Sequence, residues 1–232
     1  MTVWYTNCFR QAWIETVVIH RWRTHIKKLA STLALTLLLI TAAIAACATQ
    51  SSTTGDRTLE NLQTAFNGES NAHAKYLAFA VKADQEGYGG VASLFRAAAR
   101  AEEIHAGNHL AEIKKLGGSA QAKIDSPVVK STKENLEAAA RGETYERDIM
   151  YPDFYKQARA VGNNDALRTF NYARNAEAEH AKLFMEAFNK LENMRGKQTY
   201  YVCTVCGFTT TNLDFAKCHT CFSSKEKFLA VS

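Results

Sequence analysis

The sequence predicts a mainly α protein, in which a four-helix bundle is followed by a small cysteine-rich domain. Three observations carry this prediction. Long stretches are rich in Ala, Glu, Lys and Leu, and only 2 of the 232 residues are proline, which is typical of helical proteins. One pattern of acidic and apolar residues occurs twice, in residues 61–105 and 135–180, and four cysteines follow the second copy.

Before the bundle, residues 1–46 have the composition of a secretory signal or a membrane anchor. Basic side chains precede residues 29–46, which are an uncharged, mostly apolar run of 18. The segment 44–47, Ile-Ala-Ala-Cys, resembles the lipobox of bacterial lipoproteins, which implies a lipid on Cys47. The alternative is an uncleaved helical anchor, because 18 apolar residues are just long enough to span a membrane.

Both alternatives tether the protein to a membrane of the bacterial cell envelope. The globular part would lie outside the cytoplasm, since the positive flank is N-terminal. Residues 47–57 are small and polar, and we expect a flexible tether there. The formal net charge is +5, but residues 1–47 contribute +4 of it. The remaining chain is therefore nearly neutral, and its charge does not indicate a nucleic-acid partner.

Glycine clusters and capping residues divide the bundle into four helices. We expect these helices at residues 58–85, 91–116, 131–160 and 164–194. Ser131 begins a capping box with Glu134, and Asn164 is the expected cap of the last helix. Pro152 lies inside the third helix and predicts a kink. The long connection over residues 117–130 suits a crossover rather than a tight hairpin.

The two copies of the pattern match along their length, and the offset between them is longer by one position in their second halves than in their first halves. This indicates a duplicated two-helix unit, which supplies one glutamate and one Glu-x-x-His pair per copy. Positions three apart lie on one face of a helix, so each pair can bind the same metal ion. The candidate ligands are Glu69, Glu102, His105, Glu143, Glu177 and His180. Such an inventory is typical of a carboxylate-bridged di-metal site inside a four-helix bundle.

Four carboxylates can offset the charge of two divalent cations, and two imidazoles leave open positions for oxygen or peroxide. Carboxylate and imidazole ligands suit iron or manganese, and iron brings redox chemistry. The second copy has a further carboxylate, Glu146, where the first copy has Ala72. It could let one metal exchange ligands when its charge changes. The alternative is that Glu146 is a surface partner of Arg147 or Lys156.

The C-terminal segment, residues 196–232, follows the bundle at residues 58–195 and has no helical period. Two Cys-x-x-Cys pairs, at 203–206 and 218–221, can close one tetrahedral site from four thiolates. They are Cys203, Cys206, Cys218 and Cys221. Zinc would make this a structural ribbon and iron a one-electron carrier, while disulfides are the third alternative. The segment is too small for an independent core and needs such a metal.

The helical segment and the four-cysteine tail together resemble rubrerythrin, over about residues 58–230. In the bundle the resemblance lies in 65–70, 102–105, 142–146 with 150–152, and 177–184. It implies a ferritin-like bundle with two irons and a rubredoxin-like domain with one iron. The implied activity is that of a non-haem peroxidase, which reduces hydrogen peroxide to water. Electrons would come from an unknown donor and pass from the four-cysteine iron to the di-iron site, often across a head-to-tail homodimer.

The resemblance also implies roles for the ligands. Glu102 and Glu177 would bridge the two irons, and Glu143 and His180 would bind one of them.

The other iron would be bound by Glu69 and would exchange Glu146, its ligand when oxidised, for His105, its ligand when reduced. Tyr76 and Tyr151 fall where the family has tyrosines beside the site. The alternative for both tyrosines is an ordinary place in the core.

This sequence departs from the family in two places. Members are typically cytoplasmic, whereas residues 1–46 indicate export. The second cysteine pair is usually followed by glycine, but Phe222 follows Cys221 here, and a positive φ would strain it. This leaves room for zinc in place of iron. His219 lies between the cysteines, and we expect it to be exposed because four thiolates complete the site.

Three functions remain open at this point. The first is a membrane-tethered peroxidase with iron in both sites. The second is a ferritin-like iron oxidase or iron-handling protein of the envelope, whose ribbon holds structural zinc. The third is a non-catalytic envelope module whose ribbon contacts a partner. The metal in the cysteine site separates the first function from the other two.

Overall fold

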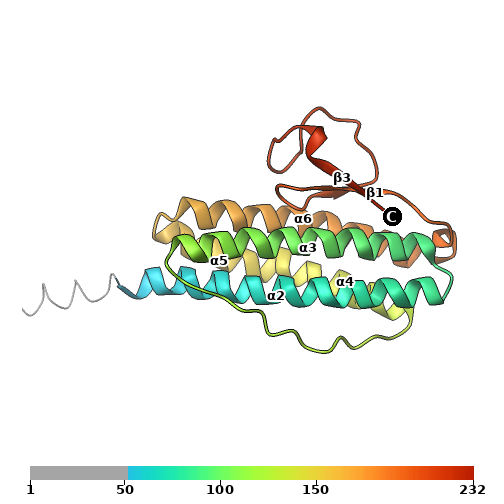
Figure 1. Ribbon diagram of the computed structural model, residues 1–232, viewed down its shortest axis with the longest axis horizontal. Helices are drawn as coiled ribbons and strands as arrows, with labels where there is room; N and C mark the ends of the chain where they lie inside the picture. The colour runs from blue at the N-terminus through green and yellow to red at the C-terminus, as the bar shows by residue number, and fades with distance from the viewer. Residues whose placement is uncertain (1–51) are drawn as a thin grey trace, which may run out of the picture. The chain divides into compact units, whose positions relative to one another are not determined.

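The structure, a computed structural model, describes residues 52–232 (Figure 1). Its α-helices are α2 (Ser52–Gln85), α3 (Gly89–Lys115), α4 (Thr132–Tyr145), α5 (Tyr151–Ala160) and α6 (Asn164–Asn189). A π-helical turn joins α4 to α5, so the chain forms the expected four-helix bundle. The expected signal or anchor over residues 1–46 and the lipidation site at Cys47 lie outside the described residues. Within the described part, no helix combines the length and apolar character that a membrane span requires.

Helix α2 begins earlier than the sequence predicted. We expected a tether over residues 47–57 and a helix from Thr58, but the helix starts at Ser52. Small polar residues do not stop a helix that has already formed, because each added residue gains a backbone hydrogen bond without a new nucleus. At the other end, Gly87 has a φ of 81° and supports the turn into α3, as its place in a glycine cluster predicted.

The connection between α3 and α4 runs along the bundle beside α2, as a crossover must (Figure 1). Two asparagines of α2 hold its backbone. The side-chain oxygen of Asn67 accepts from the N–H of Lys123 at 2.8 Å, and that of Asn71 accepts from the N–H of Asp125 at 2.8 Å. The connection therefore returns the chain to the end of the bundle where α3 began, and α4 starts there.

Two helix caps were predicted, and one is displaced by a residue. The capping box forms, since Ser131 Oγ accepts from the N–H of Glu134 at 3.4 Å and Glu134 Oε2 accepts from the N–H of Ser131 at 3.2 Å. The last helix is capped by Asn163 rather than by Asn164. Asn163 Oδ1 accepts from the N–H of Ala166 at 3.0 Å, which is the third residue of the helix and the usual donor to a cap.

The irregularity expected at Pro152 lies just before it. Residues Glu146–Met150 form a π-turn, and the N–H of Tyr151 donates to the carbonyl of Glu146, five residues back. Pro152 has no N–H to donate and is tolerated in the first turn of α5. The third helix is thus interrupted by a wide turn.

The core of the bundle contains two aromatic groups that the duplication relates. Tyr76 lies with Phe79, Phe95 and Phe184, at centroid distances of 6.3, 5.9 and 5.3 Å. Tyr151 lies with Phe154, Phe170 and His109, at 6.3, 6.1 and 5.9 Å. Each fully buried aromatic side chain contributes about 1.5–3 kcal/mol of burial free energy. The two groups therefore stabilise the packing of helices α2, α3, α5 and α6 against one another.

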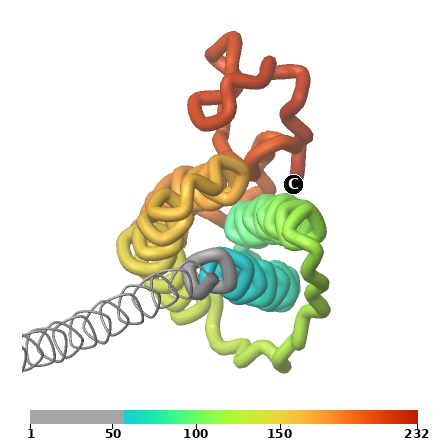
Figure 2. Tube along the Cα trace, turned by 90° about the vertical axis from the view of Figure 1, so that its left-hand side faces the viewer, coloured from blue at the N-terminus to red at the C-terminus, as the bar shows by residue number. Residues whose placement is uncertain are grey.

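The C-terminal segment forms a small antiparallel sheet. Its strands are β1 (Tyr200–Cys203), β2 (Thr209–Thr210) and β3 (Phe228–Val231), in the order β2-β1-β3. This ribbon, residues 200–231, lies beside α3 and α6 (Figures 1 and 2). Tyr200 and Val202 are buried in the core of the bundle. The ribbon thus shares the hydrophobic core of the helices, in keeping with its small size.

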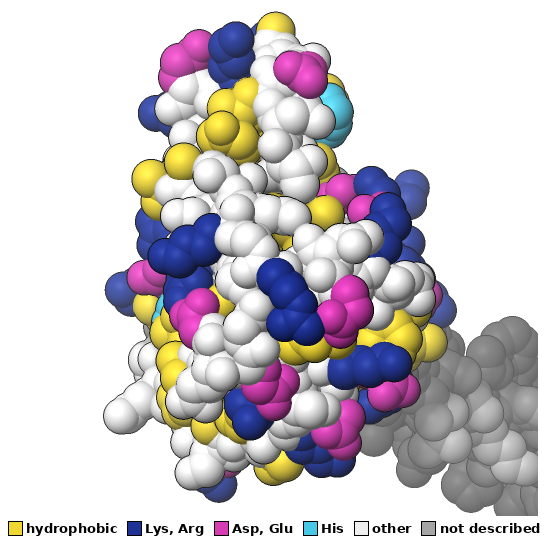
Figure 3. Space-filling view, turned by 90° about the vertical axis from the view of Figure 1, so that its right-hand side faces the viewer, with side chains coloured by type: hydrophobic (Ala, Val, Ile, Leu, Met, Phe, Trp, Pro, Cys, Tyr) yellow, Lys and Arg dark blue, Asp and Glu magenta, His cyan; other side chains and the backbone are white. Residues whose placement is uncertain are grey.

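Basic and acidic side chains are interspersed over the bundle on the face that Figure 3 shows. This mixture agrees with the nearly neutral charge of the chain after residue 47.

Candidate metal centre

Two groups of ligand atoms meet inside the bundle, and in each group the atoms lie within 4.8 Å of one another. The first group is Glu69, Glu102, His105 and Glu177, and the second is Glu102, Glu143, Glu177 and His180. Glu102 and Glu177 belong to both groups, so they are the residues that can bridge two ions. All six ligands that the repeat predicted come together, and each is at most 1% exposed.

The Glu-x-x-His spacing places each pair on one face of its helix, α3 or α6. His105 Nδ1 lies 2.9 Å from Glu102 Oε2 and 3.0 Å from Glu177 Oε1. His180 Nδ1 lies 2.8 Å from Glu177 Oε2 and 3.5 Å from Glu102 Oε1. The same nitrogen of each histidine therefore faces the carboxylates, as ligands around common ions do.

Several buried ligand atoms of this centre make no hydrogen bond of acceptable geometry, although His180 Nδ1 lies 2.8 Å from Glu177 Oε2. They are Glu69 Oε2, Glu102 Oε1, Glu143 Oε2, both side-chain oxygens of Glu177, and His180 Nδ1. Native proteins leave few buried polar atoms unpaired, because each one costs free energy. The unpaired atoms come from both ligand groups and are all electron-pair donors. The residues therefore fit two cations.

The charges of the centre lead to the same conclusion. Burial, and then repulsion by Glu177, raises the pKa of Glu102 above its ordinary value, and burial with the charge of Glu102 raises the pKa of Glu143 well above it. Burial opposes the charge of His105, but the charge of Glu177 and the hydrogen bond to Glu102 outweigh it and raise the pKa of His105. Without cations, protons supply the missing positive charge, and metal ions would displace them.

Tyr76 and Tyr151 both contact a ligand. The hydroxyl of Tyr76 donates to Glu143, and the hydroxyl of Tyr151 donates to Glu69. Both rings are buried, and burial followed by the charge of the partner glutamate raises the pKa of each tyrosine well above its usual range. Both therefore remain protonated donors. They are also core aromatics, so the two interpretations of these residues hold together.

The π-turn explains why the offset between the two copies grows by one position along their length. Glu69 and Tyr76 are seven positions apart, whereas Glu143 and Tyr151 are eight apart. Each extra residue of α-helix rotates the chain by about 100°, which would turn Tyr151 away from the face of Glu143. The wide turn over 146–150 absorbs the extra residue. Tyr151 thereby reaches the interior, as Tyr76 does in the first copy.

Glu146 begins that turn and belongs to neither ligand group. Its side chain is half-buried, and desolvation together with the charges of the carboxylates, Glu69 first, raises its pKa well above the ordinary value. The exchange of Glu146 for His105 stays a prediction, and in this structure His105 occupies the first group. Arg147, the alternative partner, instead pairs with Asp148 at 2.6 Å.

His109 was not among the predicted site residues, and it lies beside the centre. Its Nε2 lies 3.0 Å from the hydroxyl of Tyr151, and its Nδ1 lies 3.1 Å from Thr169 Oγ1. Because Tyr151 donates its proton to Glu69, it accepts from His109, which in turn accepts from Thr169. A chain of donors therefore ends at Glu69. The available signal was the spacing of four residues from His105, which places both histidines on one face of α3.

The four cysteines of the ribbon form a third group, whose sulfur atoms lie within 4.8 Å of one another. The sulfurs of Cys203 and Cys221 are 3.6 Å apart, and those of Cys206 and Cys218 are 3.5 Å apart. A disulfide would need about 2.05 Å, whereas four thiolates at about 2.3 Å from one ion lie about 3.8 Å apart. The free thiols of the structure therefore suit a tetrahedral metal site rather than the disulfide alternative.

Phe222 has a φ of 59° and is the one non-glycine residue with positive φ within residues 52–232. Gly207 takes the equivalent place after the first cysteine pair, with a φ of 77°. The strain expected at Phe222 costs about 1–2 kcal/mol, and its side chain, 72% exposed, gains little packing in return. His219 is exposed, as predicted, and belongs to no ligand group of the described residues.

The ribbon contacts the centre of its own chain, which the sequence did not predict. Three contacts join them: His105 Nε2 to the carbonyl of Cys206 at 3.1 Å, Asn108 Nδ2 to the carbonyl of Val205 at 3.0 Å, and His180 Nε2 to Thr209 Oγ1 at 3.0 Å. The four-thiolate site and the di-metal site are therefore neighbours within one chain.

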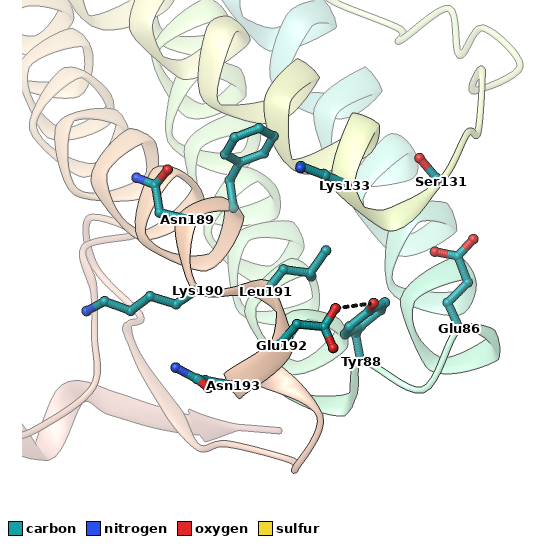
Figure 4. Close-up of a pocket in the computed structure, with 10 residues that line it drawn as sticks. Glu86, Tyr88, Ser131, Lys133, Asn189, Lys190, Leu191, Glu192 and Asn193 are labelled. Atoms are coloured by element: carbon teal, nitrogen blue, oxygen red, sulfur yellow. Dashed lines mark hydrogen bonds between the residues drawn. The ribbon is translucent and has the colours of Figure 1, made fainter.

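A separate cavity of about 550 Å³ lies at one end of the bundle, where α2 and α6 end and α4 begins (Figure 4). Its lining includes Lys133 of α4, and Tyr88, whose hydroxyl donates to Glu192 at 3.1 Å. No residue of either ligand group lines it.

The rubrerythrin family model matches residues 60–188, which include all six ligands of the centre. Nigerythrin from Nitratidesulfovibrio vulgaris is 39% identical over 174 residues, which cover 75% of this chain and 86% of that protein. The chain belongs to the rubrerythrin family. Rubrerythrin-2 from Clostridium acetobutylicum is 38% identical over 184 residues, covering 75% of this chain and 96% of that protein.

Solved structures agree with this assignment. The fully reduced, all-ferrous state of nigerythrin has a TM-score of 0.70 at 39% identity and covers 75% of this chain and 86% of that one. Bacterioferritin from Desulfovibrio desulfuricans shares the fold, with a TM-score of 0.57 at 23% identity, over 62% of this chain and 85% of that one. The expected ferritin-like bundle with a cysteine-bearing ribbon is thus confirmed, and family and ligands together support iron binding and an oxidoreductase-type role.

Proposed function

We propose that this rubrerythrin-family protein is a non-haem di-iron peroxidase, which uses two electrons and two protons to reduce hydrogen peroxide to two water molecules. One observation carries the proposal. His105 faces the carboxylates through Nδ1 and lies 3.1 Å from the carbonyl of Cys206 through Nε2. A site for two-electron chemistry and a site for one-electron transfer are therefore adjacent.

The ligands would hold two irons in the bundle, which supply the electrons for O–O cleavage when bound. Glu102 and Glu177 belong to both groups and would therefore contribute to holding both ions. The near-complete burial of the ligands excludes bulk water and strengthens their electrostatic interactions. Tyr151 holds Glu69 in place and presents a proton on the same side, as Tyr76 does at Glu143. The protons needed for water formation have donors at both ends of the centre.

The four thiolates would hold one iron, which would supply one-electron transfer, and the carbonyl of Cys206 connects that site to His105. Electrons would come from a reductant outside the chain. We expect the homodimer that the family resemblance implies. In this structure the ribbon lies against the centre of its own chain.

Metal analysis with a visible absorption spectrum on the soluble fragment beginning near Ala48 tests this proposal. We expect a red protein with about three irons per chain, bleached by a reductant and restored by peroxide. A colourless or faintly yellow protein, with zinc in the cysteine site and iron only in the bundle, would contradict it.

The second candidate is a ferritin-like iron oxidase or iron-handling protein with a structural zinc ribbon. The positive φ of Phe222, where glycine is usual, is the observation that favours it. Zinc has no redox chemistry, so a zinc ribbon could only hold structure. The same measurement separates the two, and a protein that binds iron at neither site would leave only the non-catalytic envelope module.

The location in the cell envelope is also a proposal and rests on residues 1–47 alone. A lipid on Cys47 would tether the bundle to a membrane outside the cytoplasm. The test is the distribution of full-length protein between membrane and soluble fractions. Cys47→Ala should abolish labelling by a fatty-acid analogue, and an unlabelled wild-type protein that stays in the membrane would instead indicate the uncleaved anchor.

A further inference from the structure

The two ligand histidines use their two ring nitrogens in opposite directions. Toward the centre, Nδ1 of each faces the bridging glutamates, at 3.0 Å from Glu177 Oε1 for His105 and 2.8 Å from Glu177 Oε2 for His180. Away from the centre, Nε2 of each meets the ribbon, at the carbonyl of Cys206 and at Thr209 Oγ1. All four of these side chains on the helices and the ribbon are buried.

The ribbon atoms decide which nitrogen carries the proton. The carbonyl of Cys206 can only accept, so His105 bears its hydrogen on Nε2. Thr209 Oγ1 has one proton, which it donates to the carbonyl of Gly207 at 3.0 Å. Toward His180 it therefore accepts, and His180 also bears its hydrogen on Nε2. In both rings Nδ1 is therefore the nitrogen that can offer its lone pair once a metal ion displaces the proton shared with the glutamates.

The fit between ribbon and bundle leaves little room for another arrangement. A Cβ added at Gly207 would lie 2.2 Å from His105 Nε2, so only glycine allows this approach. Thr209 is fully buried, and it lies three residues after Cys206 in the same cysteine knuckle. Asn108, three residues after His105, adds a third hydrogen bond to the same loop through Val205.

We propose that Thr209 is a positioning residue, whose hydroxyl orients the ligand His180. The ribbon then forms part of the di-metal centre rather than only passing electrons to it. The carbonyl of Cys206 does the same for His105. Because these groups belong to the loop that carries a thiolate ligand, order in the four-thiolate site is linked to metal affinity in the bundle. The inference depends on the di-metal assignment and is independent of peroxide turnover.

Release of bundle iron to a chelator tests the proposal on the full, iron-loaded chain. Thr209→Val keeps the shape and removes the acceptor, and we expect iron loss from the bundle to become about 10-fold to 100-fold faster. Thr209→Ser keeps the hydroxyl and should restore the wild-type rate. Thr211→Val makes the same chemical change at an exposed position and is the control. Absorption by the four-thiolate site, followed in the same sample, shows whether the ribbon is intact.

Equal iron release from Thr209→Val and wild type would overturn the proposal. Equal acceleration in the Val and Ser variants would also overturn it, since packing rather than the hydroxyl would then be responsible. A second measurement needs no variant. With Zn²⁺ as a diamagnetic probe in wild-type protein, nitrogen NMR should show a protonated Nε2 on His180 and His105. A protonated Nδ1 on His180 would contradict the assignment, whatever the peroxidase assay gives.

Discussion

His109 stands at the position in the first repeat that Phe184 occupies in the second. Both pack against the tyrosine of the other copy, His109 on Tyr151 at 5.9 Å and Phe184 on Tyr76 at 5.3 Å. The two copies therefore match in the shape of these side chains but differ in their polarity. The hydrogen-bond chain through His109 ends at Glu69, one of the ligands of the first group. Phe184 cannot continue such a chain, so the group around Tyr76 has no equivalent among the contacts of the described residues.

The polarity difference predicts the effect of His109→Phe. The substitution should keep the fold, because a phenylalanine already fits the equivalent place. It leaves the buried hydroxyl of Thr169 without its partner, which costs about 1–3 kcal/mol of unfolding free energy. The double variant with Thr169→Leu copies the group around Tyr76, in which Leu94 is the counterpart of Thr169. It should recover most of the lost unfolding free energy. Denaturant unfolding measures the unfolding free energy of the single and double variants. A double variant whose loss equals the sum of the losses of the two single variants would refute the explanation.

Glu146 should matter for turnover more than for iron content. It lies outside both ligand groups but beside them, in the π-turn. If the first iron exchanges ligands, Glu146→Ala should lower peroxide turnover by about 10-fold to 100-fold and leave bundle iron nearly unchanged. Glu137→Ala, on the exposed side of α4, is the matched control. A wild-type rate in Glu146→Ala, measured with iron content in the same preparation, would exclude the exchange.

Two glycine-to-alanine substitutions should have opposite effects. Gly107→Ala lies in helix α3, where the added Cβ meets no atom within 4 Å beyond its chain neighbours and the adjacent backbone of its own helix, and it should stabilise by about 0.5–1 kcal/mol. Gly207→Ala combines a φ of 77° with a contact of 2.2 Å to His105 Nε2, and it should loosen the ribbon. Hydrogen exchange of the β1 amides should rise only in Gly207→Ala. Equal protection in both variants would show that the ribbon does not depend on this approach.

The contact of Glu86 with the start of α4 predicts that the stability of the protein depends on pH. The contact with Thr132, whose N–H donates to Glu86 Oε2 at 2.8 Å, lowers the pKa of Glu86 from 4.5 to about 2. Because the folded pKa is the lower one, the stabilisation is complete above pH 4.5 and is lost as the pH falls toward about 2. Wild type should be more stable than Glu86→Gln at neutral pH, and the difference should shrink over that interval. A difference that stays constant down to the lower pH would contradict this origin.

The bundle and the meeting of its six candidate ligands were predictable because the duplication records them at regular spacing. The same comparison shows the offset change between Glu143 and Tyr151, but a one-residue insertion does not reveal whether the helix forms a kink or a π-turn. The cap at Asn163 was missed by one residue, since both neighbouring asparagines can accept from a helix start. The contacts of Thr209 with His180 were not predictable, because they join segments that only tertiary packing brings together.

We propose that the two metal sites of one chain work together on peroxide. The most direct test mixes the fully reduced, iron-loaded protein with hydrogen peroxide in a stopped-flow instrument at several protein concentrations. We expect the colour of the oxidised four-thiolate site to return at a rate that follows peroxide and is independent of protein concentration, because His105 meets Cys206 within the chain. A four-thiolate site that stays bleached while peroxide is consumed would contradict this proposal. So would a site that regains its colour no faster in the wild type than in the Glu102→Ala variant.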